Sequence, residues 1–167
     1  MACLIAFSGL PGAGKSTIAK AVARTSGAFL LRVDEIDAAI WALDPQRDIG
    51  PESYHIAAAL AVSNLRLGHS VIADCVNPWP LTRAIFTSAA ERACCAFLGI
   101  EVICSDPAVH KKRVEERVSD IIGLKVPDWA TVMQRDYKPW PEAQLHLDTA
   151  RLDVKAAVER ICLAIPD

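Results

Sequence analysis

The sequence predicts an α/β fold in which a parallel sheet lies between two layers of helices. Short apolar runs alternate with helical segments along the chain, an order that favours a parallel sheet. The first of these runs is continuously apolar, which is typical of a strand that is buried on both faces. No linker, internal repeat or low-complexity segment divides the chain. We therefore expect one three-layer α/β/α domain over residues 1–167.

The first part of the chain contains two strand–helix pairs. Residues 2–7 form a continuous apolar run closed by a glycine-rich turn, so we expect a buried strand there. Residues 15–25 carry their apolar side chains on one side of a helix. Residues 27–33 are the second expected strand, and residues 34–43 are expected to form a helix with Asp34 as its N-cap.

The middle of the chain continues the alternation. Residues 53–68 are expected to form a helix that stops at Gly68, because glycine commonly ends helices. Residues 69–75 are the third expected strand. Residues 77–95 begin with a turn and continue as a helix, and residues 96–104 are the fourth strand.

The last third of the chain contains three expected helices and one strand. Residues 106–118 predict a helix, because Pro107 suits its first turn. Residues 127–137 suit another helix. Residues 144–150 form a short final strand, and residues 153–165 have the pattern of an amphipathic C-terminal helix.

Composition and charge describe a globular chain with no electrostatic preference for nucleic acid. Hydrophobic residues make up 52% of the 167 residues, charged residues make up 23%, and the formal net charge is −2. Nucleic-acid-binding domains usually carry a basic surplus, so such a partner is not expected.

The N-terminal run lacks the basic region of a signal peptide, and no uncharged run is long enough to cross a bilayer. The six cysteines lack zinc-site spacing and are expected to be small buried hydrophobes in a reducing compartment, so we expect a cytoplasmic protein with no membrane partner.

Residues 9–16 match the phosphate-binding pattern G-x-x-x-x-G-K-[ST] without a gap. Glycines let the backbone turn so that successive N–H groups face a phosphate, and the helix that follows directs its N-terminal dipole at the same anion. Lys15 is expected to reach the β- and γ-phosphates, and the Ser16 hydroxyl is expected to bind Mg²⁺. The expected ATP-binding residues are Gly9, Leu10, Pro11, Gly12, Ala13, Gly14, Lys15, Ser16 and Thr17.

A second metal ligand is expected at the end of the third strand. Asp74 follows three apolar residues there, and the carboxyl ends of parallel strands line the ligand crevice of an open sheet. Asp74 is therefore a candidate to hold Mg²⁺ directly or through water. The alternative is a turn or cap residue before Asn77 and Pro78.

Asp34 lies where the second expected strand ends, at the same sheet edge as the phosphate motif. A kinase that acts on a hydroxyl needs a group that takes or orients its proton, and a carboxylate there can do this. Asp34 is also a good helix N-cap, and Asp37 three residues later resembles the acidic member of a capping box. Spacing alone leaves both roles open, and they can coexist.

Several cationic residues follow the fourth expected strand. Arg113 and Arg117 are four residues apart and so lie on one face of the helix expected there. Guanidinium groups near a transferring phosphoryl group stabilise its charge, whereas the alternative is a solvated surface helix with Glu–Arg pairs. Arg135 is a further candidate contact to phosphate or adenine without a fixed role.

These motifs, in this order, resemble the small P-loop kinases related to adenylate kinase. The layout is similar to the chloramphenicol phosphotransferase, zeta-toxin and polynucleotide-kinase groups, and the resemblance covers nearly the whole chain. GLPGAGKST looks like their Walker A motif, and RVDEI looks like the strand-end segment that carries their catalytic aspartate. VIADCVN is similar to their Walker B-like strand, and SDPAVHKKRVEERVSD is similar to the segment that leads into their lid.

The resemblance implies a P-loop NTPase fold whose five-stranded parallel sheet has the order 2-3-1-4-5. It implies Mg·ATP as the phosphoryl donor, a short lid at about residues 113–127 and an acceptor-binding segment at about residues 41–66. The catalytic residues that it implies are Asp34, Lys15, Arg113 and Arg117, and the metal ligands are Ser16 and Asp74.

Three functions remain open. The first is an ATP-dependent phosphotransferase that acts on a hydroxyl of a small molecule, because segment 41–66 is apolar, bears aromatic residues and has no basic cluster. The second is a polynucleotide 5′-hydroxyl kinase or a nucleoside or nucleotide kinase, although a polynucleotide needs a basic channel and this segment has only Arg47 and Arg66. The third is a nucleotide-binding switch or ATPase module, which would not need a carboxylate at position 34.

Overall fold

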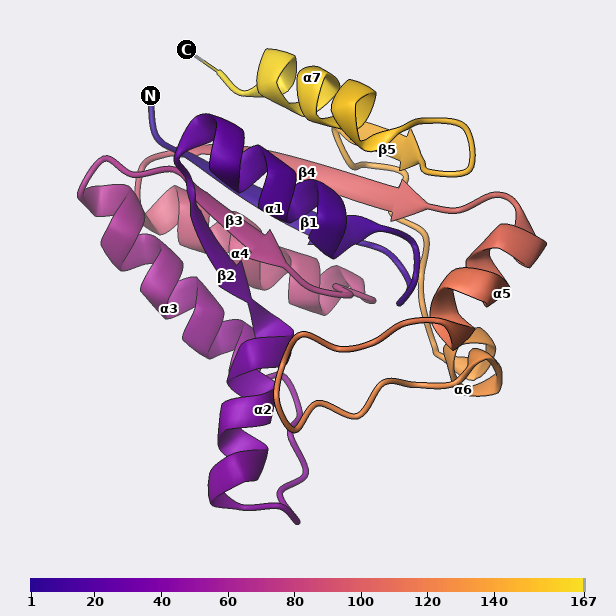
Figure 1. Cartoon of the computed structure of the whole chain (residues 1–167). Coiled ribbons are helices and arrows are strands. Elements are labelled where there is room, and N and C mark those ends of the chain that lie inside the picture. The colour runs from indigo at the N-terminus through magenta and orange to yellow at the C-terminus, as the bar shows by residue number, and fades with distance from the viewer. Residues whose placement is uncertain (167) are drawn as a thin grey trace.

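The structure is a computed structural model that describes residues 1–166, and within them it contains five strands and seven helices (Figure 1). The strands are β1 (Cys3–Ser8), β2 (Phe29–Arg32), β3 (Val71–Asp74), β4 (Ala96–Ile103) and β5 (Leu145–Asp148). The helices are α1 (Lys15–Ser26), α2 (Val33–Leu43), α3 (Glu52–Arg66), α4 (Pro80–Arg92), α5 (Pro107–Glu115), α6 (Trp129–Gln134) and α7 (Val154–Ala164). Every element expected from the sequence is present.

The five strands form one parallel sheet in the order β2-β3-β1-β4-β5, which confirms the predicted topology. The central strand is β1, where Ile5 pairs with Ile72 on one side and with Leu98 on the other. Its six residues are all buried, as expected for a strand covered on both faces. All five strands run the same way, so their carboxyl ends meet at one edge of the sheet.

Two helix layers cover the sheet, and side chains of β1 alternate between them. Cys3, Ile5 and Phe7 belong to the core that the sheet forms with α1 and α7. Leu4 and Ala6 belong to the core on the opposite face, which α3 and α4 complete. Figure 1 shows these two helix pairs on opposite faces of the sheet. The alternation follows from the two-residue period of a strand.

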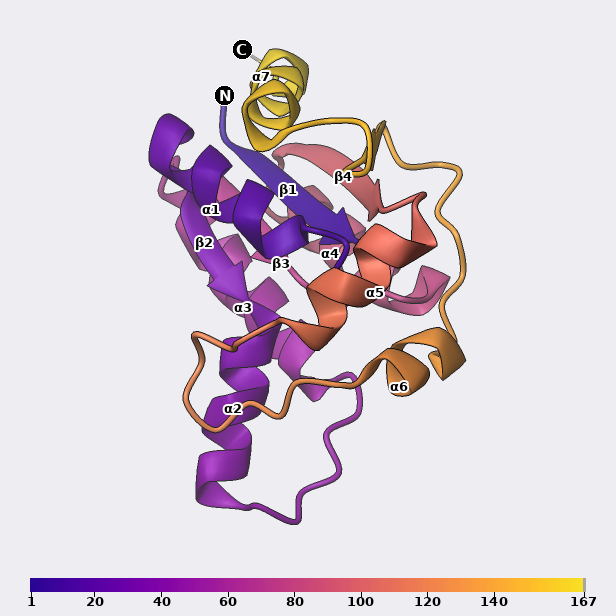
Figure 2. The same cartoon turned by 45° about the vertical axis from the view of Figure 1, so that its right-hand side comes forward.

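The remaining elements gather beyond the carboxyl ends of the strands. Figure 2 shows α5, α6 and the loop between them on this side of the molecule, with α2 projecting from the end of β2. The loop covers residues 116–128 and contains no helix or strand. Loops at this edge are where open α/β sheets bind their ligands.

Several expected boundaries differ from the observed ones, and two of these differences change the interpretation of candidate residues. The strand β2 passes into α2 without a turn, so the helix begins at Val33, and Arg32 takes the N-cap position. Asp34 is therefore the second residue of the helix and not its N-cap. The helix expected over residues 106–118 ends at Glu115, so Arg117 lies in the loop and does not share a helical face with Arg113.

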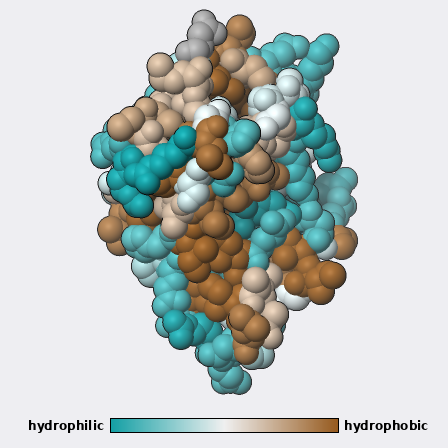
Figure 3. Space-filling model, turned by 90° about the vertical axis from the view of Figure 1, so that its left-hand side faces the viewer, coloured by the Kyte–Doolittle hydropathy of each residue, from teal (hydrophilic) through white to brown (hydrophobic). Residues whose placement is uncertain are grey.

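One apolar groove of about 360 Å³ lies beside the edge strand of the sheet, between β2, α2 and α3. Figure 3 shows the hydrophobic surface on this side of the molecule. The apolar residues that line the groove are Leu30, Leu31, Ile36, Ala39, Ile40, Leu43 and Leu60. The edge strand β2 leaves one side without a neighbouring strand, which accounts for the position of the groove.

The burial of the cysteines follows the expectation only in part. Only Cys3 and Cys75 are buried among the six free cysteines, and Cys94 is exposed, so the expectation of buried cysteines is right for two of them. Burial raises the pKa of the Cys3 thiol to about 11. Within residues 1–166, no helix combines the length and the hydropathy that crossing a bilayer requires.

Candidate active site

The loop between β1 and α1 has the backbone of a phosphate cradle. Gly9, Gly12 and Gly14 have φ angles of 141°, 81° and 101°, a region that side chains disfavour. Space excludes side chains as well, because a Cβ on Gly9 would lie 2.1 Å from the carbonyl oxygen of Val102. A Cβ on Gly12 would lie 2.5 Å from the nearest methyl group of Val114. The glycines of the motif are therefore required by this turn.

Two other parts of the chain hold the cradle in place. The imidazole Nε2 of His110, on α5, lies 2.8 Å from the carbonyl oxygen of Pro11. The hydroxyl of Thr149, directly after β5, donates to the carbonyl oxygen of Ala13 over 2.8 Å. The sequence predicts no role for either residue, because a lone histidine or threonine gives no spacing signal.

Lys15 opens α1 and is 7% exposed. Its ammonium group donates to the carbonyl oxygen of Leu10 over 2.9 Å, so the side chain curls back over the loop. Burial lowers the pKa of Lys15, while the negative charges of Asp74 and Asp34 act in the opposite direction. The charges of Asp34 and Asp74 therefore both act on Lys15 at the carboxyl edge of the sheet.

Ser16 and Asp74, the two residues expected to bind Mg²⁺, carry oxygen atoms that can bind a metal ion. Asp74 ends β3 and is 5% exposed, and both residues line the same cleft. A hydroxyl and a carboxylate suit Mg²⁺, which typically takes few protein ligands and completes its shell with water and phosphate. Among residues 1–166, no group of three or more acidic, histidine or cysteine side chains is assembled for a metal. One hydroxyl and one carboxylate fit a metal ion that is also bound by phosphates.

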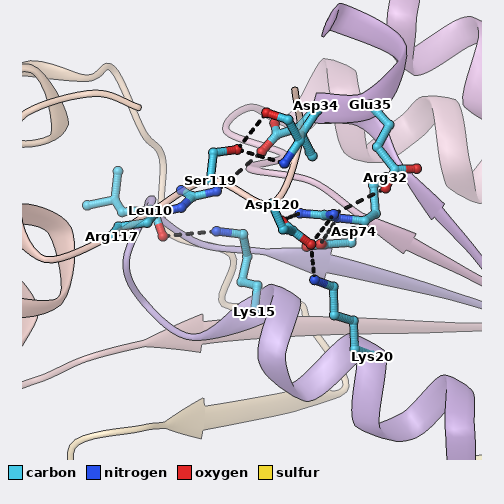
Figure 4. A network of polar contacts seen from close by, with 11 residues as sticks. Leu10, Lys15, Lys20, Arg32, Asp34, Glu35, Asp74, Arg117, Ser119 and Asp120 are labelled. Atoms are coloured by element: carbon cyan, nitrogen blue, oxygen red, sulfur yellow. Dashed lines mark hydrogen bonds and ion pairs between the residues drawn. The ribbon is translucent and has the colours of Figure 1, made fainter. Parts of the chain in front are cut away.

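Asp34 lies in the first turn of α2, and its carboxylate forms an ion pair with Arg117. The distance between Asp34 Oδ2 and Arg117 Nη2 is 3.7 Å, and the side chains are 35% and 24% exposed. Figure 4 shows Arg117 reaching from loop 116–128 towards Asp34. Two residues that the sequence predicts as candidates, Arg117 and Asp34, are thus in direct contact.

Arg113 has different partners from Arg117. Its Nη1 donates to the Thr149 hydroxyl over 2.7 Å, and its Nη2 donates to the Thr149 carbonyl oxygen over 3.1 Å. Because the same hydroxyl donates to Ala13, Arg113 is connected to the phosphate cradle through Thr149. Arg113 also lines the cleft.

A charged network that the sequence did not reveal joins the loop to the sheet edge. Arg32, which is 5% exposed, donates to both carboxylate oxygens of Asp120 over 3.0 and 3.1 Å. Lys20 on α1 pairs with the same carboxylate, and Arg32 Nε lies 3.5 Å from Asp74 Oδ2 (Figure 4). The only signal for this network in the sequence was a charged residue, Arg32, at the end of an apolar strand.

All candidate residues except Gly9, Leu10 and Ala13 line one cleft of about 1380 Å³. One half contains the phosphate cradle together with Arg113. The other half, here called the aromatic half, is lined by Asp34, Asp37, Trp41, Tyr54, Trp79 and Arg135, among others. Of segment 41–66, only residues up to Tyr54 reach the cleft.

Comparison with known proteins gives a family match and several shared folds. The AAA_33 family model, described as an AAA domain, matches residues 4–133. A search of curated proteins finds no match. The family match and the folds below confirm the predicted resemblance to small P-loop kinases.

Three solved structures cover nearly the whole chain. A candidate kinase from Chloroflexus aurantiacus j-10-fl is 22% identical with a TM-score of 0.76, covering 98% of this chain and 95% of that one. The Mycobacterium tuberculosis APS kinase CysC, in complex with AMPPNP and APS, is 20% identical with a TM-score of 0.71 and coverages of 98% and 97%. A gluconokinase from Sinorhizobium meliloti 1021 is 16% identical with a TM-score of 0.60 and coverages of 96% and 93%. Identities at this level show a shared fold.

Proposed function

The chain belongs to the AAA_33 family, and from this membership we propose that it is an ATP-dependent phosphotransferase that acts on a hydroxyl group of a small molecule. Two proteins with the same fold support the reaction class. One is an APS kinase whose structure holds AMPPNP and APS, and the other is a gluconokinase. Fold alone does not fix activity, so the proposal depends on the site.

The observation that carries the proposal is the position of Asp34. Its carboxylate lines the same cleft as the phosphate cradle and lies close enough to Lys15 to influence the lysine's pKa. A nucleotide switch has no need of a carboxylate on the far side of its phosphate site. A kinase needs one, because the acceptor hydroxyl loses its proton as its oxygen bonds to phosphorus.

The cradle half of the cleft suits the triphosphate of ATP. The loop over residues 9–17 offers backbone N–H groups and the dipole of α1, and Lys15 adds a positive charge. Ser16 and Asp74 would hold Mg²⁺, which when bound supplies positive charge to the phosphate oxygens. The cradle glycines let the loop pack closely against Val102, Val114 and Thr149, where a Cβ would crowd these neighbours.

The proposed transfer is an in-line displacement at the γ-phosphorus. The acceptor oxygen bonds to phosphorus as the bond from phosphorus to the β,γ-bridging oxygen breaks, and ADP leaves. Asp34 takes the proton of the acceptor hydroxyl. Lys15 and Arg117 stabilise the negative charge on the transferring group.

Arg113 has a supporting role in this proposal, since Thr149 occupies its guanidinium. It fixes the loop after β5 against the cradle. Loop 116–128 acts as the lid, because it carries Arg117 and Asp120 to the opposite wall of the cleft. The aromatic half holds the acceptor.

The test is acceptor-dependent ADP formation by the purified protein with Mg·ATP. The panel contains hydroxylated metabolites, nucleosides, antibiotics and a 5′-hydroxyl oligonucleotide, and products are identified by mass spectrometry as a gain of one phosphoryl group. The proposal expects a small hydroxylated compound to stimulate turnover and to carry the phosphate. Transfer to the oligonucleotide alone, or ATP binding without transfer to any compound, would contradict it.

A further inference from the structure

Asp37 is an acidic residue of the cleft for which the proposed reaction has no use. It follows Asp34 by three residues on α2, and side chains at this spacing lie on the same helical face about 5–6 Å apart. Both residues line the cleft. A molecule that places a hydroxyl on Asp34 therefore has room to place a second polar group on Asp37.

The Asp37 carboxylate has an unused acceptor atom. Its Oδ1 is shielded from solvent and has no hydrogen-bond partner anywhere in residues 1–166. Burial raises the pKa of Asp37, and a hydrogen bond with the Ser53 hydroxyl opposes this only in part. The terminal torsion of an aspartate is soft, so the carboxylate can turn towards a donor in the cleft.

The cations around Asp37 leave its charge unmatched. Arg117 lies on Asp34, and Arg135 contributes a favourable charge from farther away without any atom within ion-pair distance in the described part of the chain. Asp34 adds a like charge that raises the pKa of Asp37 further. A neutral hydroxyl could supply the missing hydrogen bond, whereas an ammonium group supplies the hydrogen bond and the missing positive charge.

The aromatic residues of this half favour the same group. The indole N–H of Trp41 donates to the carbonyl oxygen of Arg47, and that of Trp79 donates to Asp136. The hydroxyl of Tyr54 accepts a hydrogen bond from the backbone of Asn77. Trp41, Tyr54 and Trp79 all line the cleft, and the π surface of aromatic rings attracts cations.

We propose that Asp37 binds an ammonium group of the acceptor, so that the acceptor is a hydroxylated amine such as an amino alcohol or an amino sugar. The inference rests on the proposed function, because it takes Asp34 as the residue that meets the reacting hydroxyl. The amine binds the carboxylate that follows, by about one helical turn along α2, the carboxylate that meets the hydroxyl. Asp37 is then a specificity residue that contacts substrate without taking part in phosphoryl transfer.

The test compares acceptors that differ in one group. The pairs are 2-aminoethanol and ethylene glycol, and glucosamine and glucose. Phosphoryl transfer is measured with Mg·ATP, and binding is measured separately by calorimetry with the protein saturated in AMPPNP. We expect the amine of at least one pair to exceed its neutral partner about 10- to 100-fold in kcat/KM, the range of a charge-assisted hydrogen bond.

Asp37→Asn isolates the charge because asparagine keeps the shape of the side chain. It should raise the KM of the preferred amine about tenfold or more, leave kcat nearly unchanged, and remove the difference within the pair. Asp48→Asn is the matched control, since Asp48 is an exposed aspartate of the same region outside the cleft lining. Circular dichroism and Tm confirm that both variants are folded.

The outcomes separate this inference from the proposed function. Efficient transfer to neutral partners, with no effect of Asp37→Asn, would overturn the inference and leave the kinase intact. Amine binding that depends on Asp37 but without transfer would support the inference and contradict the kinase. Absence of both binding and transfer for every amine would overturn the inference.

Discussion

The guanidinium of Arg117 lies 3.7 Å from the carboxylate of Asp34, and this pair joins loop 116–128 to α2 across the cleft. A second contact, from Asp120 to Arg32, attaches the same loop to the end of β2. The loop is thus held at two points. It contributes the arginine to one ion pair and the aspartate to the other. In the proposed reaction, Arg117 stabilises the charge of the transferring phosphoryl group, and Asp34 takes the proton of the acceptor hydroxyl.

Replacing Arg117 tests its role in stabilising charge. We predict that Arg117→Ala lowers kcat about 100-fold or more, because one cation on the transferring group is lost. The KM for ATP should change much less, since the cradle and Lys15 remain. The measurement is steady-state ADP formation with the preferred acceptor. Lys112→Ala is the control, because Lys112 is 72% exposed on α5 and lies outside the cleft lining; an equal loss in both variants would contradict the assignment.

Asp120 should control how firmly the loop is held. We predict that Asp120→Asn increases hydrogen exchange in residues 116–128 about tenfold, because the loop loses its ion pairs with Lys20 and Arg32. Glu115→Gln is a matched control, since its side chain is 54% exposed like that of Asp120 and it also removes one ion pair. Unchanged exchange in the loop would show that other contacts hold it.

The same network predicts a dependence on pH. Hydrogen bonds from Lys20 and Arg32 hold the pKa of Asp120 well below its usual range. A carboxylate whose pKa is lowered by folding stabilises the native state above its unfolded pKa of about 4, and this contribution is lost as pH falls through the folded value. The Tm difference between the wild type and Asp120→Asn should therefore be present at pH 7 and shrink below about pH 4. A difference that grows at low pH would have the wrong sign.

The contrast between these two contacts shows what the sequence could predict. Lys15, Asp34 and Asp74 were foreseeable, because a local motif and two strand ends must meet at one edge of a parallel sheet. Asp120 was not, because its partner Arg32 is 88 residues away and the pair depends on the path of a loop without secondary structure. The charged run before that loop continues a helical pattern. The sequence therefore predicts a helix that extends beyond Glu115 and carries Arg117 on the same face as Arg113, whereas α5 ends at Glu115.

Thr149 was also beyond prediction, since its importance comes from two partners brought together by the fold.

We predict that Thr149→Val raises the KM for ATP several-fold and changes kcat less. The isosteric side chain cannot donate to Ala13 or accept from Arg113, so the cradle loses a support. Thr87→Val on α4 is the control, because its hydroxyl donates only within its own helix. A loss confined to kcat would contradict a supporting role.

Asp37 should reduce stability at neutral pH if its charge is poorly matched. Burial raises the pKa of this carboxyl, so its contribution to stability falls as pH rises through the folded value. We predict that Asp37→Asn raises Tm by about 2 °C at pH 7 to 8, and that the gain disappears near pH 3.5, where the carboxyl is protonated in both states. Thermal unfolding followed by circular dichroism measures both. A Tm that falls at pH 7 would mean that the carboxylate is well satisfied in the free protein.

The central claim is that Asp34 is the base of a phosphoryl transfer, and Asp34→Asn tests it most directly. Calorimetry gives the affinity for ATP, and rapid-quench single turnovers with the preferred acceptor give the rate of transfer. The account predicts an affinity within about threefold of the wild type and a transfer rate at least about 100-fold lower, because the amide cannot accept the proton. Transfer at the wild-type rate, with ATP affinity unchanged, would contradict the assignment of Asp34 as the base.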